Sequence, residues 1–303
     1  MDDAAVVRPE GAERSLVLTM DVITPIVDDA RAFGEIAACN ALSDVYAMGG
    51  RPEVALTFVG FPTEVLGDAM VREVLEGVHA VCERAQCGIV GGHTMKDSEP
   101  KCGLAVVGSV AADAIWSQRF AQPGDALILT KAIGTGIVGQ AVKKGTADPN
   151  VVAAAVAQMT SLNDIACTVG QRFGAHACTD ITGFGLLGHL RNVVEASNVQ
   201  VEIVANDVPL LPTVLDLAAG GCVPGGTRAN ASYAEPVTRF DDGVTATLRL
   251  VLADAQTSGG LLLSLPAAAA GEALQSLRSQ GVSGAAVIGS VTAGGAPGIV
   301  VRA

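Results

Sequence analysis

The sequence predicts an α/β or α+β fold arranged in two domains. Its 303 residues suit two domains, because one domain usually takes about 100–200 residues. Half of the residues are hydrophobic by type but only 3% are aromatic, so the core must be built from Ala, Val, Leu and Ile. Strand-like and helix-like segments alternate along the chain, which is typical of helices layered on a sheet rather than of a sandwich.

The first domain, residues 1–112, is predicted to run in the order strand, helix, strand, helix, strand, strand. Residues 15–23 (SLVLTMDVI) are rich in β-branched and aliphatic side chains, which favours a strand. Apolar residues recur near a period of 3.6 in residues 33–49, which predicts a helix that ends at Gly49-Gly50. The remaining elements are predicted at 54–61, 65–85, 87–91 and 103–110.

The second domain, residues 113–303, follows a break in the pattern at 112–125. That segment holds the only Trp and a Pro-Gly turn, so we place the domain boundary there. A strand is predicted first, followed by two helices, a loop that leads into another helix, and a further strand, at 126–130, 136–144, 150–172, 176–185 and 199–204. Near the C-terminus, AAVIGSV and GIVVR are predicted to be two short strands.

Charge and composition exclude several classes of protein. Nineteen basic and 31 acidic residues give a net charge of −12, which would repel nucleic acids and anionic membranes. No apolar run approaches the roughly 18 residues that span a bilayer, and the acidic start, MDDAAVVRPEGAERS, is unlike a signal peptide. Seven cysteines without a CxxC pair favour a reducing compartment. We therefore expect a cytoplasmic protein with no nucleic-acid or membrane partner.

Four aspartates occur in otherwise apolar surroundings: Asp3, Asp21, Asp44 and Asp180. Asn40 lies four residues before Asp44, so the two side chains would share one face of the predicted helix. Carboxylate and amide oxygens are the hard ligands that suit Mg²⁺. A single aspartate at the end of an element is more often a helix cap or a turn residue, and this alternative stays open for each one.

Three glycine-rich segments are candidate anion sites. Residues 87–94 (CGIVGGHT) place a diglycine directly after a predicted strand, where backbone N–H groups could converge on an anion. Residues 182–188 (TGFGLLG) open a helix, whose N-terminus favours phosphate. Residues 256–260 (QTSGG) follow what we predict to be a short strand. Each segment taken alone is more often a turn.

A GxGxxG pattern at Gly134, Gly136 and Gly139 imitates a dinucleotide-binding fingerprint. That fingerprint needs a second strand within about 30 residues, whereas two helices are predicted to follow here through residue 172. We therefore predict close helix–strand packing or a turn at these glycines. The sequence contains no GxxxxGK[ST], so a Walker-type loop is absent.

The four histidines and seven cysteines show no metal-binding spacing. We expect His79 on a helix surface, His176 in a loop and His189 in a structural role, while His93 lies within the candidate anion segment GGHT. The cysteines have no motif around them and are predicted to be small buried hydrophobic residues.

Taken together, the motifs resemble those of the selenophosphate synthetases (selenide, water dikinases), in the superfamily that includes aminoimidazole ribonucleotide synthetase. Distinct motifs occur in the same order over nearly the whole chain, and the combination of GGHT, TGFGLLGH and PGGT points to this family within the superfamily. The matching segments are DDAAV (2–6), TMDVITPIVDD (19–29), FGEIAACNALSDVYAMGGRP (33–52), GGHTMKDSEPKCGLAVVG (91–108), TDITGFGLLGHL (179–190), GCVPGGTRAN (221–230) and DAQTSGGLLL (254–263).

The resemblance implies an enzyme that makes selenophosphate from selenide, ATP and water, with release of AMP and phosphate. It implies a homodimer of two-domain α/β subunits in which the N-terminal domains form a barrel-like core. ATP would lie at that interface, with Mg²⁺ ions between its phosphates and a set of aspartates. Interposed cations would let an acidic protein hold a triphosphate.

Carried over motif by motif, the resemblance assigns residues to this site. It implies Asp3, Asp44 and Asp180 as metal ligands, and Asp21, Asp44, Gly92, His93 and Thr94 as nucleotide contacts. It assigns no catalytic residue within this sequence.

The sequence departs from the family pattern in two places. Family members carry a Gly-rich N-terminal segment, with a cysteine or selenocysteine and a lysine, before the motif at 2–6, whereas here Met1 directly precedes Asp2. Cys39 and Cys178 are candidate replacements, but both lie in apolar stretches, and a reactive thiol needs an exposed electropositive setting. GGTRAN also differs from the family's basic GGT-x-R-N pattern, whose loop contacts phosphate.

Two alternative functions stay open. One is a superfamily relative that phosphorylates or activates a small metabolite and releases ADP. The other is a non-catalytic homologue that binds the nucleotide without turnover, as expected of an ATP-holding core without the N-terminal segment. The nucleotide product, AMP or ADP, separates the first alternative from a dikinase.

Overall fold

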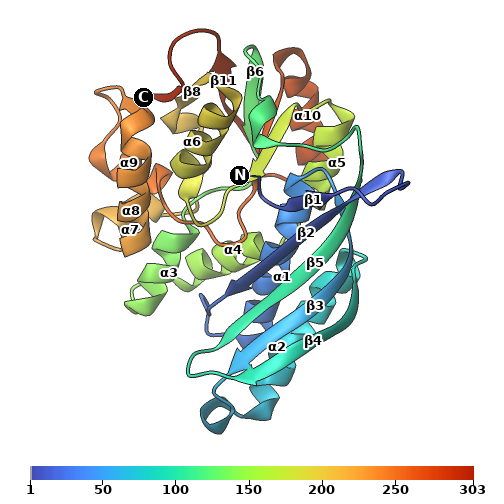
Figure 1. The fold of residues 1–303 in the computed structure, drawn as a ribbon. Helices are drawn as coiled ribbons and strands as arrows, with labels where there is room; N and C mark the ends of the chain where they lie inside the picture. The colour runs from blue at the N-terminus through green and yellow to red at the C-terminus, as the bar shows by residue number, and fades with distance from the viewer. Residues whose placement is uncertain (1) are drawn as a thin grey trace. The chain divides into compact units, whose positions relative to one another are not determined.

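A computed structural model describes residues 2–303 (Figure 1). The described chain divides into two compact units. The N-terminal unit comprises Asp3–Ile115 and Met159–Asp164, and the C-terminal unit comprises Asp2, Trp116–Gln158 and Ile165–Ala303. Each unit is considered by itself below.

The N-terminal unit is built on a five-stranded sheet with the strand order β1-β2-β5-β3-β4. Its strands are β1 (Ala5–Val7), β2 (Arg14–Ile23), β3 (Arg51–Phe61), β4 (Gly88–Lys96) and β5 (Lys101–Ala111). Neighbouring strands are antiparallel except β3 and β4, which are parallel. The predicted order of four strands and two helices is confirmed, and β1 is an additional edge strand that periodicity did not reveal.

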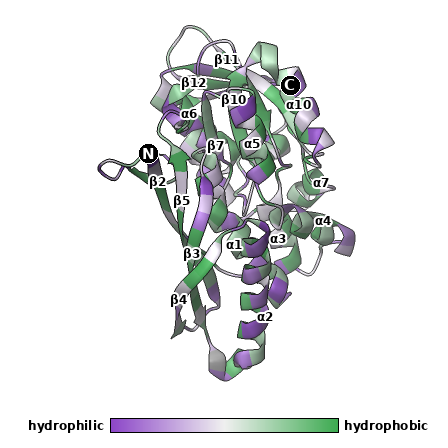
Figure 2. Cartoon of the chain, turned by 90° about the vertical axis from the view of Figure 1, so that its right-hand side faces the viewer, coloured by the Kyte–Doolittle hydropathy of each residue, from purple (hydrophilic) through white to green (hydrophobic). Residues whose placement is uncertain are grey.

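Two helices, α1 (Ala30–Ala47) and α2 (Thr63–Arg84), cover one face of this sheet (Figure 2). The two helices pack closely at Gly34. A Cβ built on this residue would overlap the carbonyl of Val74, so only glycine fits here. Helix α1 ends as predicted: Gly49 adopts a φ of 72°, and the N–H of Gly50 reaches back to the carbonyl of Val45.

The opposite face of the same sheet carries exposed apolar side chains. Thr19 and Asp21 hydrogen-bond to side chains of α1, so Met20, between them, points to the other face. Met20 and Leu56 both pair with Ala105 in β5 and therefore share this face; they are 61% and 48% exposed. We call this surface, defined by Met20, Val22 and Leu56, the open sheet face.

The C-terminal unit contains a seven-stranded sheet with the order β7-β10-β6-β11-β8-β12-β9. Strand β12 is parallel to β8 and β9, and the other neighbours are antiparallel. The strands are β6 (Asp125–Leu129), β7 (Ala177–Asp180), β8 (Gln200–Val204), β9 (Thr238–Phe240), β10 (Leu261–Pro266), β11 (Ala286–Thr292) and β12 (Gly298–Arg302).

Helices of the C-terminal unit pack with this sheet around a core of Leu, Ile, Val and Ala side chains, as the composition predicts. They are α3 (Thr135–Lys143), α4 (Pro149–Met159), α5 (Asp164–Arg172), α6 (Gly185–Ser197), α7 (Val214–Ala219), α8 (Gly225–Ala234), α9 (Ala246–Leu252) and α10 (Ala267–Ser279), with short 3₁₀ turns η1 (Gln118–Phe120), η2 (Ala205–Asp207) and η3 (Glu235–Val237). No single helix in residues 2–303 has the length and apolar character needed to cross a bilayer.

Three predicted elements of this unit are wrong in detail. The helix predicted at 150–172 is two helices, α4 and α5, bent by 54°; the break holds Thr, Ser and Asn, residues that disfavour helix interiors. The loop predicted at 176–185 contains strand β7, which forms because β10 pairs with it. The segment QTSGG follows helix α9 and precedes β10, rather than following a strand.

Candidate functional site

Strand β2 and helix α1 bring two of the predicted aspartates into a polar seam. Asn40 Nδ2 donates to Asp21 Oδ2 at 2.7 Å, and Thr19 Oγ1 donates to Asp44 Oδ2 at 2.5 Å. Because Asn40 and Asp44 lie one helical turn apart, they meet strand residues that are two apart and share one face. Asn40 and Asp44 therefore do share a face of α1, and that face is turned toward the sheet.

Burial raises the pKa of Asp21, and the hydrogen bond from Asn40 offsets part of that rise. A buried carboxylate whose charged form is disfavoured gains most from a nearby cation. The seam therefore holds two oriented carboxylates in a setting where a bound divalent ion would be stabilising.

Asp3 lies two residues before the start of β1, at the end of the strand pair where Asp21 lies. Strand β1 runs antiparallel to β2 with Ala5 opposite Leu18, so the start of β1 is directed toward the later residues of β2. The neighbouring Asp2 belongs to the C-terminal unit, where its carboxylate accepts hydrogen bonds from Ser117 Oγ and the N–H of Gln118.

The GGHT segment is not a loop after a strand, as we predicted, but lies inside strand β4. Gly92, His93 and Thr94 pair with Thr57, Phe58 and Val59 of β3. A register irregularity at Gly91, whose φ is 156°, lets the strand continue past the diglycine. A Cβ on Gly92 would overlap the carbonyl of Thr57, so only glycine allows this approach. His93 is exposed on this edge strand.

In the C-terminal unit, Asp180 is the last residue of β7 and is 1% exposed. It pairs with Leu261 of β10. The turn that follows is fastened to His189, whose Nε2 accepts the N–H of Thr182 at 3.1 Å. Burial lowers the pKa of His189 to about 4, so the ring is neutral and structural, as predicted. Asn230 of α8 donates to the carbonyl of Gly183 in the same turn.

The GxGxxG segment cannot cradle a dinucleotide phosphate, because its backbone donors are already used. Gln256 Oε1 accepts the N–H groups of Gly134 and Thr135, and Asp254 Oδ2 accepts that of Ile137. A Cβ on Gly136 would lie 2.5 Å from the carbonyl of Ala255. The prediction of close packing is confirmed, although the partner is the segment before β10 rather than a strand.

Sequence reasoning gave no individual role to Asp254 or Thr227 and placed Gln256 only within the candidate anion segment 256–260, yet these three residues connect the motifs. Asp254 is fully buried, and Thr227 Oγ1 donates to its Oδ1 at 2.6 Å. Its surroundings, VLADAQ, show the same pattern of an acid among apolar residues that selected the other four aspartates. That pattern could have found it.

All seven cysteines are buried and none forms a disulfide, so they are buried small residues, as predicted. Cys39 and Cys178 are 3% and 2% exposed, which does not suit a nucleophile. Burial also raises the pKa of Cys102 to about 12, which keeps that thiol protonated.

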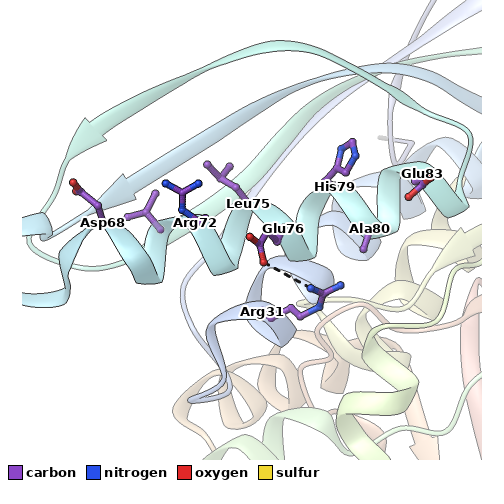
Figure 3. Close-up of a pocket in the computed structure, with 9 residues that line it drawn as sticks. Arg31, Asp68, Arg72, Leu75, Glu76, His79, Ala80 and Glu83 are labelled. Atoms are coloured by element: carbon purple, nitrogen blue, oxygen red, sulfur yellow. Dashed lines mark ion pairs between the residues drawn. The ribbon is translucent and has the colours of Figure 1, made fainter.

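A groove of about 720 Å³ lies over the outer surface of α2 (Figure 3). Its lining mixes bases with acids, and Arg31 forms an ion pair with Glu76 at 3.9 Å. His79 lies on this exposed helix surface, as predicted. None of the predicted site residues lines this groove, so it stands apart from the seam between α1 and β2.

The predicted metal ligands are divided between the units, with Asp3 and Asp44 in one and Asp180 in the other. Within residues 2–303, no three His, Cys, Asp or Glu side chains form a metal-binding group by themselves. The donor chemistry nevertheless fits Mg²⁺, which keeps several waters and is usually held by one or two carboxylates together with substrate phosphates. The metal site stays a prediction.

Comparison with known proteins gives consistent matches over nearly the whole chain. The family model described as AIR synthase related protein, N-terminal domain, matches residues 1–110, and the corresponding C-terminal domain matches residues 122–302. A selenide, water dikinase of Pelobacter propionicus is 44% identical over 290 residues, covering 96% of this chain and 83% of the relative. One from Myxococcus xanthus is 44% identical over 300 residues, covering 98% and 84%.

This chain belongs to the selenide, water dikinase family. The resemblance found in the sequence motifs is thereby confirmed. Solved structures show that proteins outside this family have the same fold. The hydrogenase maturation protein HypE superposes with a TM-score of 0.74 at 23% identity, covering 100% of this chain and 88% of HypE. Thiamine monophosphate kinase from Aquifex aeolicus gives 0.71 at 20%, covering 99% and 90%. The predicted two-domain α/β class of the family is confirmed.

Proposed function

We propose that the chain is an ATP-dependent selenide, water dikinase that converts selenide, ATP and water into selenophosphate, AMP and phosphate. The observation that carries the proposal is 44% identity over 96% of the chain to a relative of that name. A reducing cytoplasm, expected from seven cysteines that include no CxxC pair, suits a reduced substrate such as selenide.

Within this function, we assign the nucleotide site to Asp21, Asp44, Gly92, His93 and Thr94, and the Mg²⁺ ligands to Asp3, Asp44 and Asp180. Bound Mg²⁺ would neutralise phosphate charge during phosphoryl transfer. The hydrogen bonds from Asn40 and Thr19 support the assignment, because they fix the carboxylates of Asp21 and Asp44 before the ligand arrives. Such preorganisation avoids a reorganisation cost when the nucleotide binds.

We further propose that two chains pair through the open sheet face. Met20, Val22 and Leu56 are exposed apolar residues on one surface, whereas α1 and α2 cover the opposite face of the sheet (Figure 2). An exposed apolar patch of this kind marks an interaction surface. A homodimer formed through this face would bury these side chains.

The deciding experiment is a turnover assay on the full chain with ATP, Mg²⁺ and selenide, followed by phosphorus NMR, with a selenide-free control. We expect selenophosphate and AMP to appear together. Asp44→Asn and Asp180→Asn should each reduce the rate on the order of 100-fold, since each removes a carboxylate from the phosphate-binding machinery. Asp242→Asn, at an exposed position, is the matched control and should retain the wild-type rate.

Other products would support the alternatives. Formation of ADP would indicate a relative that phosphorylates a small metabolite, and nucleotide binding without turnover would indicate a non-catalytic homologue. Unchanged turnover in both the Asp44 and the Asp180 variants would contradict the site assignment while leaving the dikinase function intact.

A further inference from the structure

Asp254 is a fully buried carboxylate with donors from three different segments. It lies between α9 and β10 and has no exposed surface. Oδ1 accepts from Thr227 Oγ1 at 2.6 Å, and Oδ2 accepts from the N–H of Ile137 and from Gln256 Nε2, both at 3.1 Å. A buried carboxylate is stable only when hydrogen bonds of this kind compensate its lost hydration.

One donor leads to the PGGT motif. Thr227 lies in the first turn of α8 and is itself fully buried. From the same helix, Asn230 Nδ2 donates to the carbonyls of Gly183 and Ala253. Helix α8 is therefore hydrogen-bonded both to residues 253–254 and to the TGFG turn.

A second donor leads to the turn after Asp180. The N–H of Gln256 donates to the carbonyl of Thr182 at 3.0 Å, and the N–H of Ile181 donates to the carbonyl of Gly260 at 2.9 Å. The two residues that directly follow Asp180 are thus hydrogen-bonded to the two ends of the segment 256–260. The strand end that carries Asp180 takes its position from this segment.

Glycines make these contacts backbone to backbone. A Cβ on Gly185 would lie 2.6 Å from the carbonyl of Ala253, and a Cβ on Gly259 would overlap the carbonyl of Ile181. Such close packing leaves little room for one segment to shift without the other. A change at Asp254 would therefore be felt at both the TGFG turn and the start of α8.

We propose that Asp254 is a positioning residue of the proposed reaction: it fixes Thr227 and, through Gln256, the turn after Asp180, so that two motifs keep one relative arrangement. The inference rests on the proposed function. Capping of α3 through the N–H of Ile137 is the purely structural alternative. That cap does not require the hydroxyl of Thr227, and this difference makes the two roles separable.

The test compares Asp254→Asn, Thr227→Val and Thr227→Ser with a matched control, Asp125→Asn. Asp125 is also buried in this unit and is the first residue of β6. Its carboxylate accepts hydrogen bonds from Ser264 Oγ and the N–H of Gln122 and, within residues 2–303, none from the motifs that contact Asp254. We measure kcat and KM for ATP, thermal unfolding, and amide hydrogen exchange of residues 181–185 and 224–230.

We expect Asp254→Asn and Thr227→Val each to lower kcat on the order of 100-fold, the usual cost of a small misplacement of reacting groups. KM should change far less, exchange should accelerate in both peptides, and the double variant should be no worse than either single variant. Thr227→Ser keeps the hydroxyl and should restore kcat. Asp125→Asn should lower the unfolding temperature but keep kcat.

Wild-type kcat in Thr227→Val, or an equal loss of kcat in Asp125→Asn, would overturn the proposal in favour of simple capping. If the wild-type chain makes no selenophosphate, the proposed function fails by itself. The exchange readout still decides the positioning role, because unchanged exchange of residues 181–185 in Asp254→Asn would overturn it without any turnover measurement.

Discussion

At the scale of single residues, His189 shows how a buried ring can hold a turn in place through hydrogen bonds. Its Nε2 accepts the N–H of Thr182, and its Nδ1 lies 3.4 Å from Thr179 Oγ1. Nε2 can accept only while it carries no proton, so these contacts require the neutral imidazole. Protonation of His189 would release the turn that follows Asp180.

This arrangement predicts a loss of stability in mild acid. The pKa is about 4 in the folded chain, against 6.5 for an exposed histidine, so below pH 6.5 the unfolded chain binds the proton first. The stabilisation is complete above pH 6.5 and is lost as the pH falls toward 4, by about 3 kcal/mol in total. Urea unfolding at pH 7.5, 6 and 5 should show this slope.

The matched comparison is His189→Gln, whose free energy of unfolding should lack this part of the pH dependence. Burial raises the pKa of Asp254 to about 6, which favours the folded state as the pH falls and opposes the histidine effect. Subtracting the variant from the wild type at each pH isolates His189. A difference that stays constant from pH 7.5 to 5 would show that His189 does not titrate in this way.

Residue types could be read from the sequence, but their partners could not. Acids among apolar residues pointed to Asp21, Asp44 and Asp180 before any fold was known. That Asn40 orients Asp21 and Thr19 orients Asp44 depends on how α1 packs on β2. Asp254 was overlooked because its segment was interpreted only through its glycines, whereas two of its three donors, Thr227 and Ile137, lie far away in the sequence.

At the scale of elements, the pairing of α1 with α2 depends on two glycines. A Cβ on Gly34 would overlap the carbonyl of Val74, and one on Gly77 would overlap the carbonyl of Arg31. The helices therefore meet backbone to backbone. Because α1 carries Asn40 and Asp44, the position of this helix also determines whether these two side chains reach Asp21 and Thr19 of β2.

Gly34→Ala and Gly77→Ala should each destabilise the fold by roughly 1–3 kcal/mol, since an inserted methyl group forces the helices apart. Gly271→Ala in α10 is the control, because open space surrounds that position; it should stabilise by about 0.5–1 kcal/mol through helix propensity. Chemical denaturation of the three variants checks this. If Gly34→Ala and Gly271→Ala changed the free energy of unfolding equally, the close contact between α1 and α2 would be contradicted.

Periodicity predicted elements well where they are long and failed where tertiary pairing decides. The order of β2, α1, β3, α2, β4 and β5 followed from apolar periodicity, β-branched composition and glycine breaks. Strand β4 runs beyond its predicted end because the irregularity at Gly91 preserves its pairing with β3. Strand β7 has four residues, too few for a periodic signal, and exists because β10 pairs with it.

At the scale of the whole molecule, the open sheet face predicts the state of association. Met20→Glu would place an unpaired charge in the proposed interface, which burial makes costly, and should weaken the dimer at least about 100-fold. Val65→Glu is the control, because Val65 lies on α2 and is already 81% exposed. Sedimentation velocity measures both. A monomeric wild type, or an intact dimer of Met20→Glu, would refute pairing through this face.

Fold class could be predicted at this scale because composition and alternation of elements constrain it strongly. An aliphatic core with few aromatic residues, and helices alternating with strands, left few architectures open. That the segment Met159–Asp164 belongs to the N-terminal unit could not be predicted from the sequence. It depends on contacts such as Asn163 Nδ2 with Ser43 Oγ at 2.9 Å, which link residues far apart in sequence.

The burial of all seven thiols has a consequence for handling the protein. A thiol reagent in solution can reach these sulfurs only when the packing around them opens, so the rate of alkylation reports the opening of the fold. Four of the cysteines lie in the N-terminal unit and three in the C-terminal unit. Mass spectrometry of the modified sites would therefore time the loosening of each unit separately, using side chains that the chain already carries.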